Sequence, residues 1–229
     1  MKRLLFFSLL GLISIRGTAQ EVQFSTGKTF ATYQLVNTQG LPFEGLKNAS
    51  GSSMSLSYLG VFVDTLQTQK ENPDKALSFS QHKTRTKTLS IMHYSLGLHS
   101  FQMNALGAVQ QIPLRYETEF VGLEAGIGIK LRVKNLLHFS ARGIVSGNKL
   151  LMGTEVAGTN IYDLRQVNQF NDIKWMGGFE VQVQKKINPW ISAALQYQQT
   201  STFSPTISDT GKLDFINKQY SIGISYQLQ

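Results

Sequence analysis

The sequence contains no cysteine among its 229 residues. This excludes a disulfide framework, a thiolate zinc site and a lipid anchor on an N-terminal cysteine. Charged residues are also scarce: they make up 16% of the chain, below the roughly 25% of an ordinary soluble domain. Apolar residues make up 41%, which is too many for an intrinsically disordered chain. The length suits one domain or two small ones.

Beyond residue 20 there is also no apolar run long enough for a membrane-spanning helix, which needs about 18 residues. The one pronounced run, residues 4–15, follows two basic residues and precedes Gly17-Thr18-Ala19. This order is typical of a signal peptide with a small-residue cleavage point. A single membrane anchor is the alternative, but the run is too short to cross roughly 30 Å of hydrocarbon. We therefore expect residues 1–19 to be a signal peptide and 20–229 the mature domain.

Export narrows the choice of partners. Cleavage after Ala19 removes three basic residues, so the net charge falls from +8 to +5. An exported protein meets little nucleic acid, and we expect no nucleic-acid partner. With no membrane helix in the mature chain, any residence in a membrane has to come from β-strands.

Alternation of apolar and polar residues dominates the mature chain. Residues 120–133 place apolar side chains at seven consecutive odd positions, from Val121 to Val133. This pattern predicts a strand with one apolar face. The same alternation recurs, most weakly in the first segment, over residues 22–35, 53–63, 89–101, 136–152, 172–186, 190–200 and 219–229.

The segments are long enough to cross a membrane, which takes roughly 9–11 tilted residues. Trp175, Trp190, Tyr220 and Tyr226 near their ends match interfacial aromatic belts. A soluble lipocalin-like barrel is the alternative, but the Gly, Ser, Gln and charged face suits a narrow interior better than an outer wall. We predict an all-β fold: a transmembrane, antiparallel, up-and-down β-barrel of eight strands, with ten as the alternative, in a Gram-negative outer membrane.

This assignment divides the side chains between lipid and lumen. The side chains expected to face lipid are Val121, Leu123, Ile127, Ile129, Leu131, Phe179, Val181, Val183, Ile222 and Ile224. Eight strands leave an interior about wide enough to be filled by side chains, and buried charges need partners. We therefore expect a charge network that plugs the lumen, with Glu124 and Glu180 pairing with Arg132 and Arg142, and with Lys130 beside them. A narrow, gated solute path lined by the same charges is the alternative.

The connections predict a topology with both termini periplasmic. Lys134-Asn135 and Asn188-Pro189 read as short turns, whereas residues 36–52, 102–115, 153–171 and 201–218 read as long external loops. The link over residues 64–88 is an exception, because it is long where a short turn is expected. Its flanking strands extend past the membrane, or two further strands raise the count to ten. Within it, the basic run 81–87 (QHKTRTK) is expected to be a solvated link, with contact to anionic lipid or a periplasmic partner as the alternative.

Three further patterns carry less weight. His138 and Ser140 share a strand face, as in the His-x-Ser element of outer-membrane lipid A deacylases, but we expect both to point into the lumen. His93 and His99 lie about 20 Å apart along a strand, too far to bind one metal together. The Gly-x-Gly at residues 126–128 lies inside a strand, which excludes a nucleotide-binding loop.

Short motifs link the chain to a known family. Ala19-Gln20 at the end of the signal, Ile112-Pro113-Leu114 before a glycine-rich strand, and Ile222-Gly223-Ile224-Ser225-Tyr226 resemble the PorT-like outer-membrane β-barrel family. The chain ends Leu228-Gln229, whereas members of that family usually end on an aromatic residue. The resemblance implies a fold and a location, and it implies no activity and no functional residues.

We predict an integral outer-membrane barrel of structural or interaction type, without enzymatic activity, cofactor or metal. It acts alone or as an accessory subunit of an envelope assembly, with outer-membrane lipid and an envelope protein as partners. A small-solute channel is the first alternative, and a lipid-modifying enzyme the second.

Overall fold

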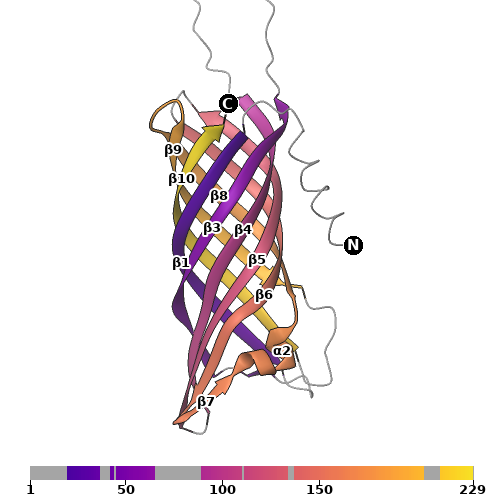
Figure 1. The fold of residues 1–229 in the computed structure, drawn as a ribbon, viewed down its shortest axis with the longest axis vertical. Coiled ribbons are helices and arrows are strands. Elements are labelled where there is room, and N and C mark those ends of the chain that lie inside the picture. The colour runs from indigo at the N-terminus through magenta and orange to yellow at the C-terminus, as the bar shows by residue number, and fades with distance from the viewer. Residues whose placement is uncertain are drawn as a thin grey trace, which may run out of the picture.

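The computed structural model describes residues 20–36, 42–43, 45–64, 89–109, 111–133, 137–203 and 212–228. Eight long strands in these ranges form a closed antiparallel barrel (Figure 1). They are β1 (Gln20–Val36), β3 (Leu46–Asp64), β4 (Leu89–Val109), β5 (Ile112–Val133), β6 (Leu137–Ala157), β8 (Lys174–Lys186), β9 (Ile191–Thr202) and β10 (Lys212–Leu228). Strands consecutive in this order pair with one another, and β1 pairs with β10 to close the ring. The predicted eight-stranded up-and-down barrel is confirmed.

Four short elements lie at the end of the barrel that is away from the termini. They are β2 (Pro42–Phe43), β7 (Asn160–Asp163), the 3-10 helix η1 (Leu164–Gln166) and the helix α2 (Asn168–Asn171). β2 pairs with β1 and β7 pairs with β6, so the sheet has ten strands although its ring has eight. In the part of the chain that the structure describes, no helix is long and apolar enough to cross a membrane.

Closure of the ring rests on one continuous register. The pairing of β1 with β10 runs without a break from Gln20↔Leu228 to Val36↔Lys212. It leaves no edge in the ring, and so no row of unpaired backbone groups. Because Gln20 pairs with Leu228, both ends of the described chain lie at the same end of the barrel. The β8–β9 turn is at this end too, where the Asn188 side-chain oxygen accepts the backbone N–H of Trp190 at 2.8 Å.

The long loop predicted over residues 102–115 is wrong. β4 continues to Val109 and β5 begins at Ile112, and these two residues pair across the hairpin. Two residues therefore make the connection, and one of them, Gln111, has the positive φ of 70° that a tight hairpin turn requires. Apolar alternation ends before the hydrogen-bonded ladder does, because backbone pairing does not need an apolar face.

The other predicted loops are likewise shortened by strands. Residues 46–52 belong to β3, 153–157 to β6, and 212–218 to β10. The signal peptide, the Lys134-Asn135 turn and residues 65–88, with the basic run 81–87, lie outside the described residues.

The two faces of the barrel differ in chemistry. Nine of the ten side chains predicted to face lipid are exposed on the outer wall, and Leu131 is half-buried there. Trp175, Trp190, Tyr220 and Tyr226 are exposed as well. The alternate positions point inward, and their polar side chains are buried. An apolar belt therefore surrounds a polar interior.

Candidate functional site: a filled lumen and a projecting sheet

A buried ion pair lies inside the barrel between β6 and β8. Arg142 and Glu180 are direct partners across these strands. Arg142 Nη2 lies 2.7 Å from Glu180 Oε2, and the two side chains are only 2% and 3% exposed. Gln196 of β9 also donates to the second oxygen of Glu180, at 3.5 Å. A buried charge is tolerated only with such partners, so the pair ties three strands together.

Glu124 of β5 has different partners from those that the sequence predicts. Its Oε2 accepts a hydrogen bond from Gln198 Nε2 at 2.8 Å and lies 3.5 Å from His99 Nδ1. The other ring nitrogen of His99 is 2.5 Å from Asn148 Oδ1. A Cβ at Gly122 would lie 2.1 Å from that same Asn148 oxygen, so the glycine makes room for this contact.

The remaining predicted charges lie nearer the termini. Lys130 Nζ is 2.7 Å from Glu21 Oε1, and Gln184 donates to the other Glu21 oxygen at 3.1 Å. Arg132 is exposed one residue before the end of β5. Among the described residues it makes no ion pair with Glu124 or Glu180, because eight residues, or about 26 Å of strand, separate it from Glu124 along β5. The structure thus brings Arg142 and Glu180 together, and it places His99 and Gln198 where Arg132 was predicted.

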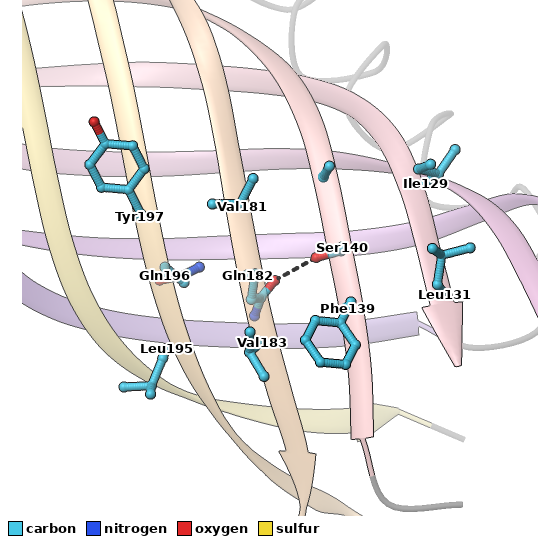
Figure 2. Close-up of a pocket in the computed structure, with 11 residues that line it drawn as sticks. Ile129, Leu131, Phe139, Ser140, Val181, Gln182, Val183, Leu195, Gln196 and Tyr197 are labelled. Carbon is cyan, nitrogen blue, oxygen red and sulfur yellow. Dashed lines mark hydrogen bonds between the residues drawn. The ribbon is translucent and has the colours of Figure 1, made fainter. Parts of the chain in front are cut away.

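The other histidine patterns both lie on strand faces that point into the lumen. Ser140 donates to Gln182 Oε1 at 3.3 Å, as Figure 2 shows, so its hydroxyl is engaged by an amide. His93 is buried on the lumen side of β4, six residues from His99. The described residues include no group of three or more His, Asp or Glu side chains that could hold a metal.

An apolar cluster fills the lumen beyond this polar region. Its buried members are Ala31, Tyr33, Phe101, Met103, Ala105, Tyr116, Phe120, Leu150, Leu164, Phe170, Met176, Leu213 and Phe215, which we call the plug. Phe101 stacks on Phe120 with ring centroids 5.8 Å apart, and Phe215 meets Tyr33 edge-on at 4.9 Å. The Tyr33 hydroxyl donates to Met103 O at 2.7 Å, so no polar atom of this ring is left unpaired. The members come from six strands, so the cluster packs across the barrel interior.

The η1–α2 segment completes the plug from outside. Asp163 begins η1, because its Oδ1 accepts the backbone N–H of Arg165 at 2.9 Å. The Arg165 guanidinium also lies 2.7 Å from Asp163 Oδ2, and these contacts hold the pKa of the Asp163 carboxyl below its ordinary value. The segment directs Leu164 and Phe170 into the barrel mouth, where Phe170 stacks on Tyr116 at 6.3 Å.

The alternation of apolar and polar residues does not by itself predict the plug, although another signal for it exists in the sequence. Along the inward positions of β10, Ser221, Gln219 and Asn217 are followed by Phe215 and Leu213. On β5 the same change separates Glu124 from Phe120. The inward residues change from polar to apolar at one level of the barrel, and that change marks the plug.

Four strands extend past the apolar belt and form what we call the projecting sheet. It consists of residues 102–109 of β4, 112–119 of β5, 152–157 of β6 and all of β7, and it forms the tapered end in Figure 1. β7 pairs with β6 alone among the described residues, so its other edge has no strand partner within those residues.

The outer face of the projecting sheet is polar near the barrel and apolar near its tip. Two cross-strand rows follow the belt: Gln102, Glu119 and Met152, then Asn104, Glu117, Thr154 and Asp163. The next row is Leu106, Arg115, Val156 and Ile161. In that row Leu106 is 48% and Ile161 72% exposed. The exposed Leu106 and Ile161 therefore lie two cross-strand rows beyond the end of the belt.

Two of the shallow grooves on the outer wall adjoin each other. One, of about 470 Å³, lies over β5, β6, β8 and β9 and includes Phe139, Val181 and Tyr197 (Figure 2). The other, of about 580 Å³, lies over β1, β10, β9 and β8. Val183 and Leu195 line both, so the grooves adjoin.

No family model matches the chain, and no curated protein does either. Among solved structures, Neisserial surface protein A matches 92% of this chain and 99% of its own, with 9% identity and a TM-score of 0.52. OprG, an outer membrane protein from Pseudomonas aeruginosa, covers 93% and 97% with 12% identity and a TM-score of 0.41. Ail, the attachment invasion locus protein of Yersinia pestis, covers 91% and 98% with 9% identity and a TM-score of 0.39. The first of these likenesses shows the fold, which is that of outer-membrane β-barrel proteins.

Proposed function

We propose that the protein is an integral outer-membrane β-barrel of the interaction type, which docks an envelope protein partner through its projecting sheet. One observation carries the proposal: the lumen is filled, whereas the strands on one side continue past the apolar belt and expose apolar side chains there. The surface available for a specific contact is therefore the projecting sheet and not a pore.

The dimensions of the belt support the membrane location. On β5 the outward apolar residues run from Val121 to Val133. At about 3.3 Å per residue and a tilt near 45°, this stretch covers roughly 28 Å of height, close to the apolar band of an outer-membrane barrel. On β10, the exposed Ile222 and Ile224 lie between Tyr220 and Tyr226 on the same outer face. With the termini in the periplasm, the projecting sheet faces outward.

The open edge of β7 supports a particular mode of docking. An unpaired strand edge is a template for a strand from another chain. Ile161 lies on this edge strand, and Leu106 lies in the same cross-strand row. A partner strand added to β7 would cover Ile161 and satisfy the backbone groups of the edge. We further propose that the protein is an accessory subunit of an envelope assembly, because the projecting sheet offers a surface to a protein partner.

The alternatives have less support. A solute channel needs a continuous wet path, and the plug stands across it. A lipid-modifying enzyme needs a serine activated by a base and facing lipid, whereas Ser140 points into the lumen and donates to Gln182.

Affinity purification from outer membranes in mild detergent tests the docking. We expect a stoichiometric envelope protein to co-purify with the wild-type chain and to be lost from the double variant Leu106→Asp/Ile161→Asp. Val167→Asp is the matched control, because Val167 is an exposed apolar residue outside the projecting sheet. Each variant must keep the altered gel mobility of an unheated, folded barrel. A partner retained by the double variant, or no partner on the wild type, would overturn the proposal.

A further inference from the structure

An arc of aromatic side chains crosses the outer wall at the edge of the belt that lies away from the termini. The rings of Phe30 and Tyr220 lie 6.1 Å apart, those of Tyr220 and Tyr197 5.0 Å, and those of Tyr197 and Phe179 6.1 Å. The arc thus joins β1, β10, β9 and β8. Tyrosine at such an edge is typical of a membrane–water interface.

Two lysines lie within this arc. Lys28 is the cross-strand partner of Tyr220, and Lys218 is the cross-strand partner of Phe30. The two lysines and the two aromatic residues form a two-by-two block on neighbouring strands, in which the lysines occupy one diagonal and the aromatic residues the other. Both lysines are exposed and occupy outward positions. Residues on one diagonal of such a block are roughly 7–8 Å apart at most, within joint reach of one small anion.

Neither lysine is neutralised by a neighbour in the described ranges. The outward residue beside Lys28 on β3 is Ser52, and the one beside Lys218 on β9 is Gln199. Asp214 lies four residues farther along β10 and accepts a hydrogen bond from Thr202 at 3.1 Å. The ion pairs of the described residues include neither Lys28 nor Lys218. The block therefore presents two positive charges to the interface.

The larger of the two adjoining grooves begins next to the lysines, on the side toward the termini. Thr26 and Ile222 line the part of the groove nearest the lysines, and they are the next outward residues after Lys28 and Tyr220. Ala193 also lines the groove, and its small side chain leaves the groove open between Phe24, Leu195 and Ile224. A chain of methylene groups leaving the lysines would enter this groove and could continue past Leu195 into the second one.

We infer that this surface is a binding site for an anionic, phosphate-bearing lipid of the outer leaflet. A lipid phosphate lies between Lys28 and Lys218, the aromatic arc flanks the headgroup, and an acyl chain fills the groove. Lysines at this depth extend their ammonium groups to the headgroup region while their stems cover apolar surface. The inference rests on the proposed membrane location. It is independent of the docking partner, because the site lies on the belt and not on the projecting sheet.

Titration of the purified, detergent-solubilised protein with diphosphoryl lipid A tests the site, with bound lipid counted by native mass spectrometry. We expect Lys28→Gln and Lys218→Gln each to weaken binding about fivefold and the pair about 30-fold, as loss of one cation near an anionic lipid predicts. Lys47→Gln is the matched control, because Lys47 is exposed on β3 outside the block. Ala193→Trp fills the groove and should also weaken binding while both charges remain. Uncharged diacylglycerol should bind the wild type and the lysine variants equally.

Two results would overturn the inference. One is undiminished lipid A binding by the folded double lysine variant, and the other is an equal loss in Lys47→Gln, which would show attraction by net charge alone. Retention of the docking partner is measured separately on the same variants. Loss of lipid binding with the partner retained supports the lipid site alone, so a failure of one proposal is distinguishable from a failure of the other.

Discussion

Replacing Arg142 by Met should destabilise the barrel strongly, because it leaves the Glu180 carboxylate buried without its counter-charge. The guanidinium is 2.7 Å from the carboxylate, and both side chains are almost fully shielded from solvent. After the replacement, the contact from Gln196 at 3.5 Å remains as a weak partner. The carboxylate must then be protonated or hydrated, or the lumen must open.

Removing one partner of a buried pair costs about 3–5 kcal/mol of unfolding free energy. We expect this loss for Arg142→Met and a similar loss for Glu180→Gln, which leaves the guanidinium unpaired. The double variant Arg142→Met/Glu180→Gln leaves no buried charge at the position. It should therefore lose less than either single variant, and this non-additivity identifies the pair as the cause.

Urea unfolding from lipid vesicles measures these differences. Trp175 and Trp190 are the two tryptophans of the chain, and both are exposed on the outer wall, so their emission reports departure from lipid. Arg165→Gln is the control, because it removes an ion pair at the surface and should lower the unfolding free energy much less than loss of the buried pair does. If Arg142→Met unfolds at the wild-type urea concentration, or if the two single losses simply add, the account of the lumen is refuted.

Three further predictions concern the plug, the lumen face and the η1 cap. The wild-type barrel should give no steady conductance in planar bilayers, whereas Phe120→Ala/Phe215→Ala should produce measurable openings; a conducting wild type would contradict the plug. Ser140→Ala should leave the mass spectrum of lipid A from cells that express the protein unchanged, and a loss of modified species would show catalysis. The Asp163 pKa, followed by NMR, should lie below that of an unfolded reference and rise in Arg165→Gln. Because the folded-state pKa is the lower one, the stabilisation of the cap is present above the unfolded-state pKa and is lost as the pH falls through the folded-state pKa; an unshifted pKa would contradict the ion pair.

The sequence predicted the barrel well wherever one strand face is apolar. Residues 120–133 alternate over seven pairs of positions, and they form the membrane-crossing part of β5 with the predicted phase. A two-residue period shows which face of the strand each side chain occupies. Because the two faces of this barrel differ in polarity, the period predicts the position of the strand, its phase and the extent of the apolar belt.

The sequence failed where a strand has no apolar outer face. Residues 102–115 carry Gln102, Asn104, Arg115 and other polar side chains at outward positions next to the hairpin, so they read as a loop. Their strands are held by backbone pairing and by inward residues such as Met103. The predicted partner of Glu124 in the lumen was wrong for a related reason. Which charge meets Glu124 depends on the stagger between strands, and this register cannot be read from any one strand.

In vivo photo-crosslinking from position 161 tests the central claim most directly. A photoreactive amino acid at Ile161 lies on the open edge strand of the projecting sheet, and the same amino acid at Leu195 lies on the belt. The account predicts a discrete protein adduct from position 161 and only lipid adducts from position 195. Lipid adducts from position 161, or the same protein adduct from both positions, would contradict it.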